Sequence, residues 1–262
     1  MSLHQPRKRF GQHFLHDRDV VERIINAVNP QPGQTIVEIG PGLGAITLSL
    51  LDRIGELHVI ELDRDLAKII SDQCKNIGKL YLHNADALEF DFGKIAEKNI
   101  RVIGNLPYNI STPLIFHLLD QLECISDMVF MLQEEVVDRM NADPGTRTYG
   151  RLSVMVQAQC RVQKLFHVGP GSFNPPPKVE SAIVKLVPHK TPVTDIKNHD
   201  TFNMIVRESF NQRRKTLRNA IKNFLDTKQI ESLEIDPGMR PEQLTIQQFA
   251  SLSNLYHTQQ NQ

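Results

Sequence analysis

The four-residue stretch N-L-P-Y at 105–108 has the residue types that most directly suggest chemistry. The apolar run 100–103 before it predicts a strand, and Ser-Thr-Pro at 111–113 predicts the start of a helix. The stretch is therefore predicted to lie in a strand-to-helix loop at the carboxyl end of a strand. Open α/β sheets bind their ligands at such loops.

This loop offers two neutral hydrogen-bond acceptors beside an aromatic ring. Pro107 disfavours a helical conformation at Leu106, which leaves the Leu106 main-chain carbonyl free to accept from a ligand. Asn105 adds a side-chain carbonyl, and Tyr108 adds a flat ring. Such a set suits a planar base with an exocyclic amine. The alternative is an ordinary turn with a packed tyrosine.

The elements that must position this loop begin with a nucleotide-binding βαβ pattern. A buried strand is predicted at 35–39, followed by G-P-G-L-G at 40–44 and a helix to Leu51. The next strand, 57–60, ends at Glu61, about twenty residues beyond the first glycine, where an acid can bind ribose hydroxyls. The spacing also fits G-x-G-x-x-A, so at this point a nicotinamide-dependent dehydrogenase remains open.

Acidic residues are predicted at three successive strand ends: Glu38, Glu61 and, after the strand 80–83, Asp86. Glu38 precedes the glycines, where a carboxylate suits a cationic ligand better than a pyrophosphate. S-adenosylmethionine has a sulfonium and an ammonium and no phosphate, so the pattern favours this cofactor. Taken singly, each acid could instead be a helix cap or a surface carboxylate.

The other predicted elements complete an α/β, Rossmann-like domain over residues 1–190. They are a helix from Asp17 or Asp19 to Val28, a helix around 114–119, a strand at 128–132, helices at 134–140 and 151–160, and strands at 162–168 and 181–187. The segment 173–179 contains three consecutive prolines and is predicted to be a rigid extended loop. It would direct Phe173 towards the ligand, although a core position is the alternative.

The remainder, 191–262, is predicted to be a small all-helical C-terminal domain with a basic surface. Between 207 and 222 there are six cations against one anion, and the run 210–219 would place several of them within two helical turns. These cations are Arg207, Arg213, Arg214, Lys215, Arg218 and Lys222. A further basic arm contains Arg7, Lys8 and Arg9. Both groups suit contacts with RNA phosphates, and a merely solvated face is the alternative.

Composition limits the setting of the protein. The 262 residues have 30 Lys plus Arg and 30 Asp plus Glu, so only the distribution of charge can indicate a nucleic-acid partner. The three cysteines are well separated and include no C-x-x-C pair, which indicates buried thiols and no metal site. There is no apolar run of membrane length and no signal-peptide core. A cytoplasmic protein without membrane contact is predicted.

The ordered set of motifs resembles the KsgA-type (RsmA) ribosomal RNA adenine dimethyltransferases over nearly the whole chain. The motifs are G-Q-H-F-L (11–15), E-I-G-P-G-L-G (38–44), E-L-D (61–63), N-A-D-A-L (84–88), N-L-P-Y (105–108), F-N-P-P-P-K-V-E-S (173–181), F-N-Q-R-R-K-T-L-R-N (210–219) and R-P-E-Q-L (240–244). His13 departs from the family pattern, which often has Asn there. This departure leaves the role of position 13 open.

The resemblance implies a Rossmann-like, S-adenosylmethionine-dependent methyltransferase with a helical RNA-binding tail. Its cofactor-binding residues would be Gln12, His13, Leu15, Glu38, Gly40, Gly42, Leu43, Glu61, Asp86, Ala87 and Asn105. Asn105 and the Leu106 carbonyl would bind the target amine, with Tyr108 and Phe173 stacking on the base. The implied substrate is a pair of adjacent adenines near the 3′ end of small-subunit rRNA in an immature 30S-type subunit, each dimethylated at N6 by a monomeric enzyme.

Three other functions stay open beside this one. One is an rRNA-binding assembly factor that keeps the fold with little catalytic role. Another is a methyltransferase for large-subunit rRNA, which would share the first domain's motifs but not 210–219 and 240–244. The third is a DNA adenine methyltransferase, which uses similar chemistry on a different nucleic acid.

Overall fold

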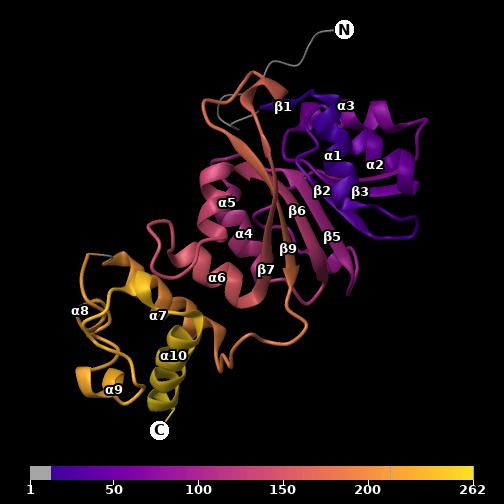
Figure 1. Ribbon diagram of the computed structural model, residues 1–262. Helices are drawn as coiled ribbons and strands as arrows, with labels where there is room; N and C mark the ends of the chain where they lie inside the picture. Colours follow the sequence, from indigo (N-terminus) through magenta and orange to yellow (C-terminus); the bar gives the residue numbers. More distant parts are fainter. Residues whose placement is uncertain (1–12, 213, 262) are drawn as a thin grey trace. The chain divides into compact units, whose positions relative to one another are not determined.

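The computed structural model describes residues 13–212 and 214–261 (Figure 1). The chain divides into two compact units: residues up to Val137 with Gln163–Pro188, and Asp138–Val162 with the residues from His189 onward. Residues Asp138–Val162 thus group with the tail. The division at residue 190 inferred from the sequence stays a prediction.

The first unit is built on a seven-stranded sheet with the order β4-β3-β2-β5-β6-β9-β7. These strands are β2 Ile36–Ile39, β3 Glu56–Ile60, β4 Lys79–His83, β5 Ile100–Asn105, β6 Ile125–Gln133, β7 Cys160–Val168 and β9 Ser181–Pro188. Strands β2 to β6 pair in parallel, and β9 pairs with β6 in the antiparallel sense. The predicted α/β fold is confirmed.

Helices follow the parallel strands, as βαβ connections require. Those that follow β2, β3, β5 and β6 are α2 Thr47–Ile54, α3 Arg64–Cys74, α4 Ser111–Leu119 and α5 Glu134–Met140, while α1 Arg18–Val28 precedes β2. Figure 1 shows α1, α2 and α3 close to β2 and β3. Asp17, one of the two predicted caps, accepts from the main-chain N–H groups of Asp19 and Val20 and so begins α1.

Both faces of the central strands are buried. Ile103 and Val129 belong to the core cluster that includes α1 and α2, while Val102 and Phe130, which alternate with them, are also fully buried. This explains why the strands read as continuous apolar runs. Strand order reverses between β2 and β5, so the loops that follow these two strands border the crevice where open α/β sheets bind ligands.

Gly104 allows β5 and β2 to approach each other at this point. A Cβ atom at Gly104 would lie 2.5 Å from the main-chain oxygen of Ile39, a distance that no side chain tolerates. Any larger residue would push apart the strand ends that lead into the glycine loop and the N-L-P-Y loop.

A two-stranded antiparallel sheet joins distant parts of the first unit. Strand β1, Phe14–Leu15, pairs with β8, Phe173–Asn174, with Leu15 opposite Phe173. A 3₁₀ turn at Pro170–Ser172 leads into β8, and another at Phe92–Lys94 precedes β5. The pairing brings the segment before α1 to the segment before β9.

In the second unit, the described residues after Pro188 form helices and turns. They are α7 His199–Asn211, α8 Leu217–Ala220, α9 Thr227–Glu231, a 3₁₀ turn at Pro241–Gln243 and α10 Ile246–Gln260. Helix α6, Arg151–Gln159, contributes to the same unit. The ring centroid of Phe210 lies 6.2 Å from that of the buried Tyr149 and 5.7 Å from that of the buried Phe249. Across the described part of the chain, no helix combines the length and apolarity needed to span a membrane.

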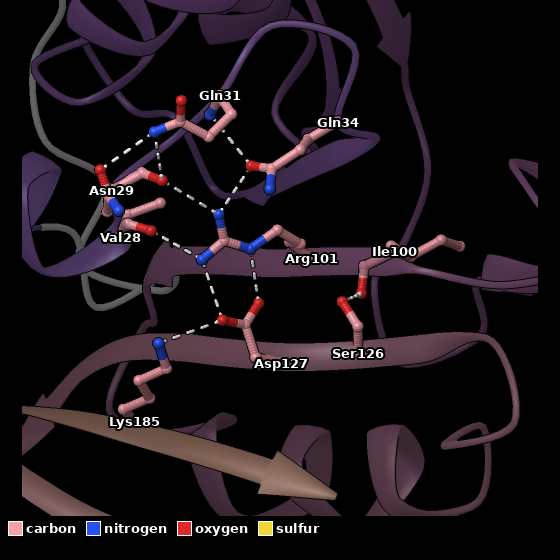
Figure 2. A network of polar contacts seen from close by, with 9 residues as sticks. All are labelled: Val28, Asn29, Gln31, Gln34, Ile100, Arg101, Ser126, Asp127 and Lys185. Carbon is pink, nitrogen blue, oxygen red and sulfur yellow. Dashed lines mark hydrogen bonds and ion pairs between the residues drawn. The ribbon is translucent and has the colours of Figure 1, made fainter.

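A buried ion pair joins β5 to β6 near their amino ends (Figure 2). Arg101 binds both carboxylate oxygens of Asp127, with nitrogen–oxygen distances of 2.7 and 2.9 Å, and also donates to the Val28 carbonyl and the Gln34 side chain. Lys185 of β9 lies 3.3 Å from the same carboxylate. The guanidinium is thereby hydrogen-bonded on several sides, which is the condition under which a buried pair is tolerated.

We expect Arg101→Met to lower the free energy of unfolding by about 1–3 kcal/mol, because it leaves the part-buried Asp127 carboxylate with Lys185 as its remaining cationic partner. The matched control is Lys75→Met, which breaks the exposed pair with Asp72 and should cost about 0–1 kcal/mol. Urea unfolding monitored by circular dichroism measures both. Equal losses in the two variants would contradict a structural role for the buried pair.

Candidate active site

A cavity lies at the carboxyl ends of β2 to β5, bordered by the loops that follow these strands and by the residues of β1. The structure brings most of the predicted site residues to it. Those that line it are His13, Leu15, Glu38, Gly40, Gly42, Leu43, Glu61, Asp86, Ala87, Asn105, Leu106 and Tyr108. Predicted Gln12, Arg7, Lys8, Arg9 and Arg213 lie outside the described residues.

The glycine loop after β2 brings its main chain to the cavity. Gly40, Gly42 and Gly44 have φ angles of 67°, 57° and 87°, in the left-handed region that favours glycine. A Cβ at Gly42 would lie 3.1 Å from the ring of Phe14. The loop therefore admits no larger residue there unless the ring moves, and a ligand can approach its backbone closely.

Glu38, at the end of β2, is buried and incompletely bonded. Its side chain is 1% exposed, and its Oε2 has no hydrogen-bond partner among the described residues. Burial, with a smaller contribution from the nearby charge of Glu61, raises the pKa of Glu38 to about 7, although the Thr47 hydroxyl opposes the shift. A buried carboxylate oxygen without a donor is costly, so this group is suited to a ligand that supplies positive charge or N–H donors.

Glu61, at the end of β3, faces the same cavity. Burial raises its pKa to about 7 as well, although main-chain N–H groups oppose the shift, including that of Asp63, which donates to Oε1 over 2.8 Å. The neighbouring loop is connected through Asn84, whose Nδ2 donates to the Glu61 carbonyl over 2.7 Å. Asp86 accepts from the Leu88 N–H, which keeps one of its oxygens in the loop.

The composition of the cavity fits S-adenosylmethionine. Among the described lining residues, none is lysine or arginine, while three buried carboxyl groups (Glu38, Glu61 and Asp63) and an open glycine loop are present. A pyrophosphate would meet these acids without a counter-charge. A ligand with a sulfonium, an ammonium and a ribose supplies the positive charge and the hydroxyl donors that the acids lack.

The N-L-P-Y loop borders the same cavity. Asn105 Nδ2 donates to the main-chain carbonyl of His13 over 3.2 Å. The Leu106 carbonyl accepts no hydrogen bond from the described residues. Tyr108 is hydrogen-bonded through its hydroxyl to Ser181 Oγ at 2.7 Å, and burial raises its pKa, so the ring stays neutral. Two carbonyl oxygens and a neutral ring are thus available at one side of the cavity.

Phe173 is not brought to the cavity. Its ring is 2% exposed and belongs to the core cluster, because pairing with Leu15 turns it inward. The predicted stacking of Phe173 on the target base finds no support in this placement, and the core alternative describes its position.

Two polar residues of the site were not predicted from the sequence: Asn84, which links the loops after β3 and β4, and Ser181, which holds the Tyr108 hydroxyl. Both lie inside motifs that the sequence displays, N-A-D-A-L and the end of F-N-P-P-P-K-V-E-S. A serine at the start of an apolar strand is the sequence signal that could have identified Ser181, because a polar residue that is fully buried there needs a hydrogen-bond partner.

The tail cations that the structure describes are exposed, but they do not form a helical row. Helix α7 ends at Asn211, and α8 begins only at Leu217, whose N–H donates to the Met239 carbonyl. The expectation that 210–219 places its cations within two helical turns is therefore wrong. Arg214, Lys215, Arg218 and Lys222 are exposed, while Arg207, also exposed, pairs with Glu208 at 3.0 Å.

Fold and site together define a class. A mostly parallel sheet with one antiparallel strand, a glycine loop after its first parallel strand and an acid after the second are the features of a Rossmann-like, S-adenosylmethionine-dependent methyltransferase. The sequence profile of the family described as "Ribosomal RNA adenine dimethylase" matches residues 3–258, and the chain belongs to this family. The predicted resemblance is confirmed, and the alternative of a nicotinamide-dependent dehydrogenase is wrong.

Similar proteins cover almost the whole chain. "Ribosomal RNA small subunit methyltransferase A" of Nitrosococcus oceani is 52% identical over 255 residues, covering 97% of each chain. The protein of the same name from Pseudomonas aeruginosa is 53% identical over 253 residues, covering 96% of this chain and 94% of its own. A dimethyladenosine transferase from Plasmodium falciparum has a similar structure, with a TM-score of 0.78, 28% identity and coverage of 92% and 96%. The 23S rRNA methyltransferase ErmE, at 22% identity, a TM-score of 0.73 and coverage of 93% and 99%, shows the shared fold alone.

We expect Glu38→Gln to change how the cofactor-free protein responds to pH. A carboxyl whose pKa is about 7 in the folded state and 4.5 ordinarily binds its proton more tightly when folded, so stability falls as pH rises from 4.5 to 7. At 1.36 kcal/mol per pKa unit, this loss is on the order of 1–3 kcal/mol at pH 8. Urea unfolding at pH 5 and pH 8 should show a smaller loss of stability in Glu38→Gln than in the wild type, because the variant keeps only the contribution of Glu61.

The same substitution should weaken binding of S-adenosylmethionine, measured by calorimetry at pH 8. The exposed Glu231→Gln is the matched control and should change neither quantity. A pH dependence that is identical in the wild type and Glu38→Gln would contradict the raised pKa.

Proposed function

We propose that this chain transfers methyl groups from S-adenosylmethionine to N6 of two adjacent adenines near the 3′ end of small-subunit (16S) rRNA, giving N6,N6-dimethyladenines. The observation that carries the proposal is the placement of the N-L-P-Y loop on the same cavity as the buried acids Glu38 and Glu61. Family membership and the small-subunit names of relatives at 52–53% identity support the substrate. The target would be an immature small subunit in the cytoplasm, approached by a monomeric enzyme.

The cofactor would be held by the loops after β2, β3 and β4. The glycine loop offers close main-chain approach, Glu61 is placed for the ribose hydroxyls, Asp86 for the adenine amine and Glu38 for the positive end. When bound, S-adenosylmethionine supplies an electrophilic methyl group on a sulfonium. The chain's own task there is to fix that group's position and to exclude water from it.

The N-L-P-Y loop would activate the target amine. The lone pair of an adenine N6 is delocalised into the ring, so this amine is a poor nucleophile. Hydrogen bonds from its two N–H groups to the Asn105 side-chain carbonyl and the Leu106 carbonyl favour the tetrahedral nitrogen of the transition state. A side-chain base is not required, because an N–H proton becomes acidic once the nitrogen has accepted the methyl group and carries a positive charge, and this proton can then pass to water.

Tyr108 would bind the displaced base. Taking an adenine out of its stack costs a few kcal/mol, and stacking on an aromatic ring returns about 1–3 kcal/mol per base. Because these free energies are similar in size, the ring should contribute to RNA binding as well as to rate. The hydrogen bond to Ser181 keeps the ring in place for this role.

The function is tested by transfer of labelled methyl groups to small subunits that lack the modification, followed by mass spectrometry of the rRNA. We expect dimethyladenine at two adjacent positions near the 3′ end. Asn105→Ala should reduce turnover by roughly 100-fold or more, as loss of one preorganised polar contact to the reacting group does elsewhere. Its affinity for S-adenosylmethionine should change little.

The exposed Asn76→Ala is the matched control and should be fully active. Label in large subunits or duplex DNA instead would contradict the proposed substrate. Stable binding to small subunits without transfer would identify an assembly factor. Unchanged turnover in Asn105→Ala would exclude activation of the amine by carbonyl oxygens.

The exposed tail cations are proposed to contact RNA phosphates. Arg214→Ala with Arg218→Ala should weaken small-subunit RNA binding and reduce the slope of log K against log salt by about 0.7–0.9 for each phosphate that the protein no longer neutralises. The double variant Lys75→Ala with Lys94→Ala, on the first unit, removes equal charge as a control. Equal slopes in both double variants would assign Arg214 and Arg218 to a merely solvated face.

A further inference from the structure

Three interactions converge on His13, the residue whose role the motifs leave open. Its main-chain carbonyl accepts from Asn105, its ring stacks on Tyr108, and its ring Nδ1 bonds to the Pro175 carbonyl. We propose that His13 is a positioning residue for the target adenine, acting through Asn105 and Tyr108. This role rests on the proposed function of the N-L-P-Y loop and adds a residue to it.

The main-chain contact selects the orientation of the Asn105 amide. A carbonyl oxygen can only accept, so the 3.2 Å contact requires the NH₂ end of Asn105 to face His13. The Oδ1 end of the same amide is then turned away from His13. Reversing the amide would lose this bond and present N–H donors to an amine that itself needs an acceptor. The contact therefore favours the orientation in which Asn105 can bind N6.

The ring contact supports Tyr108 from one face. The His13 and Tyr108 ring centroids lie 5.7 Å apart, with 26° between the ring planes. The hydroxyl of Tyr108 is held separately by Ser181 at 2.7 Å. Fixed at its hydroxyl and on one face, the ring has little freedom to swing, and a planar base would stack on its other face.

The imidazole is itself held in place. The Pro175 carbonyl has no proton to donate, so the 2.7 Å contact requires His13 Nδ1 to carry the hydrogen. Immediately beside this bond, Phe14 pairs with Asn174 and Leu15 pairs with Phe173 in the two-stranded sheet. Phe173 therefore connects to the N-L-P-Y loop indirectly: it pairs with β1, and His13, just before β1, contacts Asn105 and Tyr108.

The experiment compares His13→Ala, which removes the ring, with His13→Phe, which keeps a flat ring but no Nδ1–H donor. The exposed His16→Ala is the control from the same segment. Cofactor affinity is measured by calorimetry, and the transfer rate in single turnovers at saturating cofactor. Whatever its cofactor affinity, we expect His13→Ala to lose roughly 10-fold in transfer rate at saturating cofactor, the scale of a stacked ring pair. His13→Phe should recover most of this loss.

A second measurement needs no RNA. Because the chain has four tyrosines, selective ¹³C labelling with Tyr108→Phe as the assignment control resolves the Tyr108 ring signals in the cofactor-free protein. His13→Ala should shift and broaden them, and His16→Ala should not. Unmoved Tyr108 signals would overturn the proposal whatever the substrate is.

The remaining outcomes separate the two proposals. Weaker cofactor binding in His13→Ala, with an unchanged rate at saturation, would make His13 a cofactor contact and overturn the positioning role. An unchanged rate in both His13 variants would also overturn it. A wild-type chain that transfers no methyl group to small subunits would refute the proposed function, while the Tyr108 signals would still show whether His13 positions the ring.

Discussion

The buried carboxyl groups of Glu38 and Glu61 line one cavity to which no described lysine or arginine contributes, and the carboxyl edge of the sheet is arranged around this constraint. Both pKa values are raised to about 7, chiefly by burial, so the cofactor-free protein bears a cost for keeping these acids inside. A cationic ligand lowers the free-energy cost of keeping these acids buried, and this gain contributes to the affinity for the cofactor. The same carboxyl groups disfavour a pyrophosphate. They therefore favour a cationic cofactor and exclude a dinucleotide.

Features determined by local sequence could be predicted. The buried strands, the glycine loop and the acids after β2, β3 and β4 each depend on a few consecutive residues, and parallel strands bring their carboxyl ends to one edge. Predicting the strands is therefore enough to place Glu38, Glu61 and Asp86 at one edge of the sheet, where all three line the cavity. The position of the N-L-P-Y loop on the same cavity could be predicted for the same reason, because it follows β5, which pairs in parallel with β2.

Features that depend on residues distant in the chain could not be predicted. Phe173 follows a turn and precedes three prolines, a context that suits a ligand loop as well as a core, and only its pairing with Leu15 decides between them. The basic run at 210–219 has no helix breaker, yet α7 ends at Asn211, and the first residues of α8, Leu217 and Arg218, donate to the carbonyls of Met239 and Pro237. The contact between His13 and Asn105 joins positions 92 residues apart, which no local pattern encodes.

The neutrality of the amine-binding loop follows from the acids beside it. A carboxylate at position 105 would accept hydrogen bonds more strongly than an amide, but it would add another acid to a cavity that four acids already line: Glu38, Glu61, Asp63 and Asp86. Like charges and burial would raise its pKa, and in the protonated form it would donate where the amine needs an acceptor. An amide carbonyl and a main-chain carbonyl accept without titrating. The uncharged acceptors at Asn105 and Leu106 therefore keep the target amine's partners independent of the protonation of the cofactor's acids.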